Sequence, residues 1–286
     1  MRTASPLRYP GGKWRVTPFF EQLLRINGLG NIRYVEPYAG GASLALSLLL
    51  RGKVAEVHLN DLDPAIYAFW HSLLTRSSDL VEFIERVPIT PDEWYRQKNV
   101  YERQSKVCRF SLGCATFFLN RTNHSGILNA GMIGGKRQDG PWTLDARFNR
   151  PELISRVKRI AGFRSRIHLS CRDALDVVND YRRAKRTLLY LDPPYYNPGY
   201  HLYMNDYSHD DHVAVRQVVE KVTGPWVVSY DDRLAIRRLY RHVRSRKIHL
   251  LHTARVARDG AEVMFFAEGL HIPRKPSISG QRHVTP

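Results

Sequence analysis

The sequence predicts an α/β protein with a doubly wound, mainly parallel sheet of seven strands, interrupted by an inserted helical unit. Strand-like and helix-like stretches alternate over residues 33–74 and again over 167–267, a pattern typical of parallel sheets. Residues 187–191 (TLLYL) are continuously apolar, as expected of a central strand buried on both faces. Residues 76–165 break the alternation and mark the insert.

In the first half, residues 33–36 form the first expected strand, followed by a Gly turn and a helix that begins at Ser43. Residues 54–60 alternate between polar and apolar side chains and predict the second strand. A helix is expected over 64–74, with Asp63 as its N-cap, because a side-chain oxygen there accepts a free backbone N–H.

The second half repeats the pattern, and its last two strands are expected to pair antiparallel at one edge. The expected strands are 167–170, 187–191, 226–229, 247–251 and 263–267, with a helix over 173–180. In the insert, residues 79–120 have helical spacing and residues 121–150, rich in Gly and Asn, predict a long loop or hairpin. These boundaries give a discontinuous sheet domain (1–75 and 166–272), an insert (76–165) and a loose polar tail (273–286).

The charge of the chain favours a polyanionic partner, with nucleic acid foremost. The 286 residues include 44 Lys and Arg against 27 Asp and Glu, a net charge of +17. Residues 96–166 hold 15 basic and 4 acidic side chains, a net of +11, so most of the excess lies in the insert. A solvated surface is the alternative explanation. With 43% hydrophobic and 25% charged residues, disorder and collagen-like repeats are excluded.

The chain is expected to be cytoplasmic, without a membrane partner. Its longest apolar run, 44–50, ends at Arg51 and is far shorter than a membrane span. The N-terminus has no apolar signal core. The three cysteines include no CxxC pair, which fits a reducing compartment and predicts that no metal is bound.

A Gly-rich turn, 35–43 (VEPYAGGAS), joins the first strand to its helix. Glycine permits close backbone approach, and a helix N-terminus offers free N–H groups to a ligand. This is where doubly wound folds bind nucleotides, although a plain strand-to-helix turn would read the same way. Asp61 follows the next strand about 20 residues later, as expected of a ribose-binding carboxylate.

The most informative motif is Asp-Pro-Pro-Tyr at 192–195, directly after the apolar strand 187–191. The prolines fix the backbone and remove two N–H donors, which leaves carbonyl oxygens able to accept. The end of a central strand is a ligand-binding position in such sheets, and the tyrosine can stack on a planar ring.

Two other segments carry simpler interpretations. Residues 209–212 (HDDH) look like metal ligands but lie at an expected helix start, where acidic side chains suit the helix dipole. The basic run 233–247 is expected to be a solvated helix face, with contact to phosphate as the alternative.

The motifs 192–195 and 36–41 (EPYAGG) resemble those of the DNA amino-methyltransferases, and the sequence is most similar to the DNA adenine methylase (Dam) family. Further matches in the family's order are LRYPGGK at 7–13, FLNR at 118–121, Asp173, SYD at 229–231 and EV at 262–263. The resemblance covers roughly residues 5–270. After residue 121 the insert departs from the best-known members, so no recognition sequence is implied.

The resemblance implies a Rossmann-like methyltransferase sheet, S-adenosylmethionine as methyl donor, and transfer to N6 of an adenine flipped out of double-stranded DNA. The residues implied at the donor are Tyr9, Lys13, Glu36, Gly40, Asp61, Asp173 and Asp192. Those implied at the target base are Asp192, Pro193, Pro194 and Tyr195, with Tyr195 stacking on the base. The insert is expected to recognise DNA, and its candidate contacts are Asn120, Arg121, Lys136, Arg137 and Arg147.

Three other functions are weighed against this one. Transfer to the N4 amino group of cytosine uses a similar Pro-Pro-aromatic loop, but the motif order and the GGK segment favour adenine. A silent DNA-binding module would not need an intact Asp-Pro-Pro-Tyr motif. An RNA or protein substrate is disfavoured because the insert lacks interleaved aromatics. A monomer is expected, and any restriction nuclease would be a separate chain.

Overall fold

A seven-stranded sheet forms the centre of the protein in the computed structural model, which describes residues 3–9, 13–196, 207–252 and 258–274. The strand order is β3-β2-β1-β4-β5-β7-β6. The bounds are β1 Arg33–Glu36, β2 Glu56–Asn60, β3 Ile167–Ser170, β4 Thr187–Leu191, β5 Trp226–Asp231, β6 Ser245–His252 and β7 Arg258–Phe266. Strands β1 to β5 are parallel, and β7 is antiparallel to both β5 and β6. The predicted α/β class and the antiparallel pairing are confirmed.

The apolar strand β4 lies between β1 and β5, and all five of its residues are buried. The chain turns back at this point, since β2 and β3 lie on one side of the β1–β4 pair and β5 to β7 on the other. Such a reversal of strand order opens a crevice at the carboxyl ends of the strands, where these sheets bind ligands.

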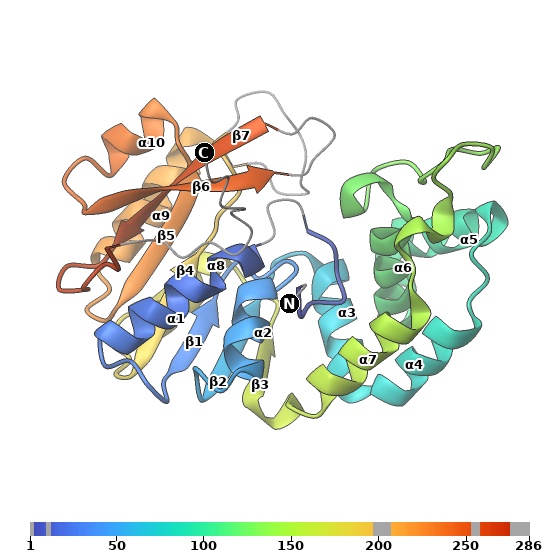
Figure 1. Ribbon diagram of the computed structural model, residues 1–286, viewed down its shortest axis with the longest axis horizontal. Helices are drawn as coiled ribbons and strands as arrows, with labels where there is room; N and C mark the ends of the chain where they lie inside the picture. Colours follow the sequence, from blue (N-terminus) through green and yellow to red (C-terminus); the bar gives the residue numbers. More distant parts are fainter. Residues whose placement is uncertain (1–2, 10–12, 197–206, 253–257, 275–286) are drawn as a thin grey trace, which may run out of the picture.

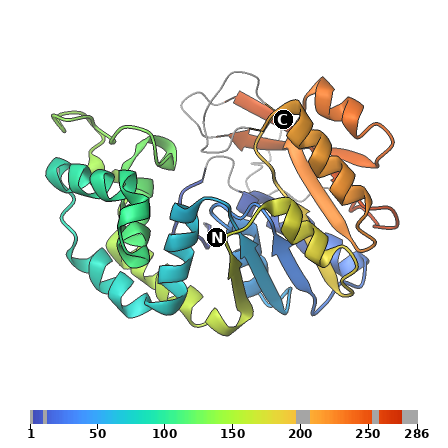
Figure 2. The same cartoon turned by 180° about the vertical axis from the view of Figure 1, so that it is seen from behind.

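Helices cover both faces of the sheet (Figures 1 and 2). Helices α1 (Thr17–Ile26) and α2 (Ser43–Leu50) cover one face, and α8 (Ala174–Tyr181) and α9 (His209–Glu220) the other. Helix α1, which the sequence patterns did not single out, packs Phe20 edge-on against Tyr190 of β4, with ring centroids 5.0 Å apart. Among the described helices, none is long and apolar enough to cross a membrane.

Helix starts follow the capping rules. Helix α3 (Pro64–Thr75) begins after the predicted cap Asp63, whose carboxylate accepts from the Ala65 N–H at 2.8 Å. Helix α9 begins with a capping box in which Ser208 and Asp211 satisfy each other's backbone N–H groups, so the HDDH segment caps a helix. The expectation for 233–247 was wrong, because α10 spans only Leu234–Leu239 and β6 follows from Ser245.

The insert forms a group of helices beside the sheet, seen on the right of Figure 1. Its helices are α4 Ser77–Arg86, α5 Pro91–Glu102, α6 Arg109–Thr122 and α7 Arg150–Ala161. Helix α6 packs closely against α3, where a Cβ at Gly113 would lie 2.6 Å from the Ala68 carbonyl oxygen. Between α6 and α7 the chain forms short 3-10 turns and one isolated bridge, Asn123 to Met132. It is therefore a loop and not a hairpin.

Candidate active site

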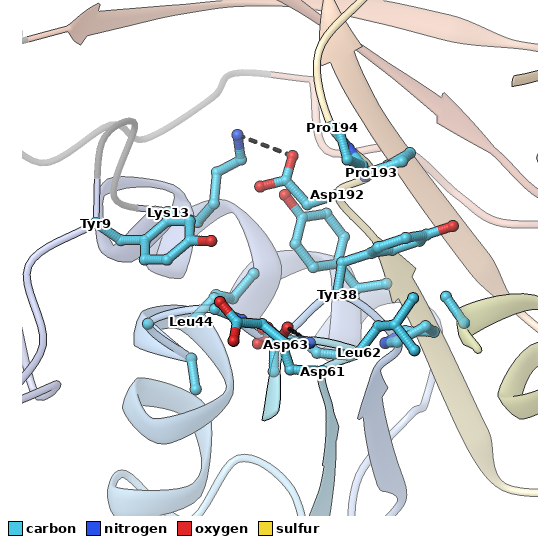
Figure 3. A pocket seen from close by; sticks show the side chains of 18 of the residues that line it. Tyr9, Lys13, Tyr38, Leu44, Asp61, Leu62, Asp63, Asp192, Pro193 and Pro194 are labelled. Atoms are coloured by element: carbon cyan, nitrogen blue, oxygen red, sulfur yellow. Dashed lines mark hydrogen bonds and ion pairs between the residues drawn. The ribbon is translucent and has the colours of Figure 1, made fainter. Parts of the chain in front are cut away.

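One cavity lies at the carboxyl ends of β1, β2 and β4, at the point where the strand order reverses (Figure 3). Nine of the residues expected at the donor or the target base line it: Tyr9, Lys13, Glu36, Gly40, Asp61, Asp192, Pro193, Pro194 and Tyr195. They come from parts of the chain far apart in sequence, and the sheet brings them to one edge.

The Gly turn forms part of the cavity wall with Tyr9 lying on it. Gly40 has a φ of +45°, and a Cβ there would lie 2.7 Å from the Tyr9 ring. At Gly41 an added Cβ would lie 3.0 Å from the Cβ of Tyr9. The carbonyl of Gly40 accepts from the Trp70 indole at 2.9 Å. The turn therefore requires glycine, because a side chain would displace the aromatic ring.

Asp61 joins the turn to the end of β2. Its carboxylate accepts from the Gly40 N–H at 2.8 Å and from the Asp63 N–H at 3.0 Å. Burial raises the pKa of Asp61 to about 7, and these two N–H donors oppose that shift. Asp63 also lines the cavity, so two carboxyl groups face it from this side (Figure 3).

Glu36 ends β1 and is buried beneath the cavity. Its Oε1 accepts from the Tyr34 hydroxyl and from the Ala45 N–H, both at 3.1 Å. Burial raises the pKa of Glu36 to about 8, so the carboxyl group mostly keeps its proton at neutral pH. Glu36 thus supports the first turn of α2 without placing a full charge in the core.

Asp192 follows β4 directly and reaches into the cavity. The Ser229 hydroxyl donates to its Oδ1 at 2.6 Å, and Tyr190 in turn donates to Ser229 at 2.8 Å. The ammonium of Lys13 lies 3.0 Å from the same Oδ1 (Figure 3). Burial raises the pKa of Asp192, and the Lys13 charge opposes this shift. Oδ2 takes part in neither of these contacts.

Lys13 is shared by two carboxylates. Its nitrogen lies 2.9 and 3.0 Å from the two oxygens of Glu262 on β7, and the Tyr195 hydroxyl donates to Glu262 at 2.8 Å. Burial disfavours the ammonium, but Asp192 and Glu262 together raise the pKa of Lys13 well above its usual range. Among the described residues, the ammonium of Lys13 thus contacts Asp192, Glu262 and Tyr195, all of them at the site.

Several lining or supporting residues were not expected as site residues. Ser229 and Glu262 were noted only as parts of matching motifs, although a carboxylate inside an apolar strand is itself a signal, because a buried charge needs a partner. Tyr38 and Tyr207 both line the cavity, with their hydroxyl groups 3.0 Å apart. Tyr38 belongs to the EPYAGG motif at 36–41, whereas no local pattern marks Tyr207.

Asp173 does not line the cavity. It is exposed and caps α8, where its carboxylate accepts from the Leu175 N–H at 2.7 Å. Its neighbour Ala174 is a lining residue, so Asp173 lies at the rim. The two glycines of the GGK segment, 11–12, lie outside the described residues.

Asn120, expected to contact DNA, instead makes hydrogen bonds inside the protein. It is buried, and its amide donates to the carbonyls of Arg8 and Gly126, both at 2.8 Å, while its oxygen accepts from the Arg8 N–H at 2.7 Å. Both amide hydrogens are used inside the protein, which corrects the sequence-based expectation. Arg121 donates to the carbonyls of Pro6 and Arg147.

The other three basic candidates are exposed on the loop between α6 and α7. Arg137 pairs with Asp139 at 3.1 Å. The Arg147 guanidinium lies 5.6 Å from the ring centre of Trp142. Across the described parts of the chain, there is no group of three or more metal-ligating side chains.

A doubly wound sheet with a partly buried Asp-Pro-Pro-Tyr motif at its crevice is the arrangement expected of an amino-methyltransferase. The family model described as D12 class N6 adenine-specific DNA methyltransferase matches residues 9–256. The chain belongs to this family and is an adenine-specific DNA methyltransferase, which decides between adenine and cytosine in favour of adenine.

The chain also aligns with a curated relative in sequence and with a solved structure in fold. The chain is 23% identical over 206 residues to the Type II methyltransferase M.MjaIII of Methanocaldococcus jannaschii, covering 66% of this chain and 68% of that protein. A solved structure of a conserved hypothetical protein of Streptococcus pyogenes aligns over 85% of this chain and 89% of that one, with 9% identity and a TM-score of 0.34.

Proposed function

We propose that the cavity binds S-adenosylmethionine and that Asp192 activates the N6 amino group of an adenine flipped out of double-stranded DNA. The observation that carries the proposal is the position of Asp192. It ends a central strand, is oriented by Ser229 and lies in the same cavity as the Gly turn. Asp192, which would act on the target base, and the Gly turn, which would bind the methyl donor, thus line the same cavity.

The residues fit the proposed donor. The Gly turn lets the Tyr9 ring lie against the cavity wall, where a Cβ at Gly40 would collide with it. Asp61 and Asp63 line the cavity on the side of β2, and carboxylates there suit ribose hydroxyls. S-adenosylmethionine would supply a methyl group activated by its sulfonium. Asp173, at the rim, would lie nearest the adenine end of the donor.

Asp192 would act on the acceptor nitrogen. The lone pair of an exocyclic adenine amine is delocalised into the ring, which makes the amine a weak nucleophile. Asp192 Oδ2 and the Pro193 carbonyl would accept its two N–H groups and favour a more tetrahedral nitrogen. Positioning and a preorganised polar site would supply much of the acceleration. Pro194 would fix the loop, and Tyr195 would stack on the base.

The insert would hold the DNA. We propose that 1–75 with 166–272 is the catalytic domain and that 76–165 recognises the target. The net charge of +11 over 96–166 supports this division, because basic side chains bind DNA by neutralising its phosphates. Binding of this kind weakens steeply as the salt concentration rises. The chain would act as a monomer inside the cell, and any restriction nuclease would be a separate chain.

Methylome sequencing tests the proposal. The chain and its Asp192→Ala variant would each be expressed in a host whose DNA carries no methylation. We expect one adenine-containing motif to be modified by the wild type and no modification by the variant. Modification by Asp192→Ala at the wild-type level would refute the proposed mechanism.

A second measurement addresses the silent-module alternative. Purified chain would be mixed with duplex DNA, RNA and a labelled methyl donor. Label transfer to duplex DNA alone is expected. Binding of duplex DNA without any transfer would favour the module.

A further inference from the structure

A second cavity lies on the insert, outside the proposed donor site. It has a volume of about 350 Å³, and its lining includes Arg8, His124, Trp142 and Arg147. The cavity therefore joins the N-terminal segment to the loop between α6 and α7.

The cavity has an uncompensated positive charge. Arg121 donates to the Arg147 carbonyl, and Arg8 donates to the Asn123 carbonyl at 3.0 Å. Within the described part of the chain, Arg8, Arg121 and Arg147 make no ion pair with a carboxylate. The nearby Glu152 pairs with Arg156 at 2.5 Å.

Burial and like charges both act on these guanidinium groups. Burial and the charge of Arg147 lower the pKa of Arg8 to about 10. Burial, followed by the charge of Arg8, lowers the pKa of Arg121 to about 9. The guanidinium groups of Arg8 and Arg147, which both line the cavity, repel each other, so an anion bound there would relieve the repulsion.

An exposed aromatic ring lies at the same place. Trp142 is 62% exposed, although an indole of this size is usually mostly buried. The Arg147 guanidinium lies near its ring. Aromatic faces beside guanidinium groups are typical of nucleic-acid sites, where the ring stacks on a base and the cation binds the backbone.

Contacts within the protein hold the wall of the cavity in place. Asn120 fixes the backbone of Arg8 at both its N–H and its carbonyl. Gly126, with a φ of +78°, lies so close that a Cβ would be 2.7 Å from the Arg8 carbonyl oxygen. The hydrogen bonds that keep the Asn120 side chain inside the protein therefore also hold Arg8 in position for binding DNA.

We propose that this cavity is a DNA-binding pocket in which Arg8 and Arg147 hold a backbone phosphate and Trp142 stacks on the adjoining nucleotide. This proposal rests on the proposed function and specifies one place where the DNA would bind. Because a phosphate contact carries no sequence information, the pocket would position the duplex whatever the recognition motif is.

The test measures the affinity of the full chain for random-sequence duplex DNA over a range of salt concentrations. Arg147→Ala is expected to weaken binding and to reduce the slope of log affinity against log salt by about one, since one phosphate contact is lost. Trp142→Ala should weaken binding about fivefold or more with little change of slope, and Trp142→Phe should restore much of the loss.

Arg86→Ala is the matched control, because Arg86 is an exposed insert arginine that pairs with Glu82 on α4. It should leave affinity and slope unchanged. Thermal unfolding midpoints confirm that the variants fold, as expected for side chains this exposed. If Arg147→Ala and Trp142→Ala bind duplex as well as an active wild type does, the pocket is refuted and the proposed function stands. A wild type that binds no duplex and transfers no methyl group refutes both.

Discussion

The ammonium of Lys13 lies 3.0 Å from the carboxylate of Asp192, and the same nitrogen lies 2.9 Å from Glu262. One buried cation thus serves two acidic groups. Lys13 lowers the cost of ionising Asp192 in a buried place. The charge state of Asp192, the proposed acceptor for the adenine amine, therefore depends on Lys13.

Lys13→Met leaves two carboxylates facing each other without a cation. We expect a loss of about 3–5 kcal/mol in the free energy of unfolding, as for other broken buried ion pairs, measured by urea denaturation. The acid limb of the methyl-transfer pH profile should move to higher pH, because the pKa of Asp192 rises further without Lys13. In Lys13→Met/Glu262→Gln one negative charge is removed as well, so stability should partly return. An unchanged pH profile in Lys13→Met would contradict the proposed dependence.

Ser229 orients the proposed catalytic carboxylate through a 2.6 Å hydrogen bond. Ser229→Ala should lower kcat for methyl transfer about 10- to 100-fold, since a hydrogen bond to a charged group contributes about 1.5–3 kcal/mol. Donor affinity should change little. Ser72→Ala is the control, because Ser72 is another buried serine and, among the described residues, its hydroxyl bonds only to a helix carbonyl, that of Ala68. Equal activity of the two variants would exclude the orienting role.

Gly40 is the position where a side chain would collide with Tyr9. Gly40→Ala should weaken the binding of S-adenosylmethionine, measured by calorimetry. Gly28→Ala separates collision from backbone strain, since Gly28 has a φ of +63° and no other atom within 4 Å of the added Cβ. It should cost about 1 kcal/mol of stability and leave donor affinity unchanged. Similar donor affinities in both variants would count against the proposed role of the turn.

Glu36 should make stability depend on pH. Its pKa is about 8 in the folded protein and about 4.3 in an unfolded chain, so the folded state holds the proton over that interval. The stabilisation from the neutral carboxyl is complete below about pH 4 and is lost as pH rises through 8. The wild type should therefore lose stability relative to Glu36→Gln between about pH 5 and 8, by denaturant titration. Parallel curves for the two proteins would show that Glu36 is ionised throughout.

The strands were predictable because their patterns are local. Residues 33–36, 167–170 and 187–191 matched β1, β3 and β4 in full, since continuous apolar runs and short alternations already specify burial. The basic run 233–247 was misread because charge on a surface does not distinguish a helix from a strand. A sharp turn after Leu239 and pairing with β7 decided its structure.

The sequence by itself determined the fold class, the Gly turn and the Asp-Pro-Pro-Tyr motif, because periodicity, glycine and proline act on neighbouring residues. Only the tertiary structure decided what Asp192 and Asn120 touch. Lys13 meets Glu262 across 249 positions of sequence, and Asn120 meets Arg8 across 112. Such contacts exist because the packing of α1, β7 and the insert sets the distances, and no local pattern carries that information.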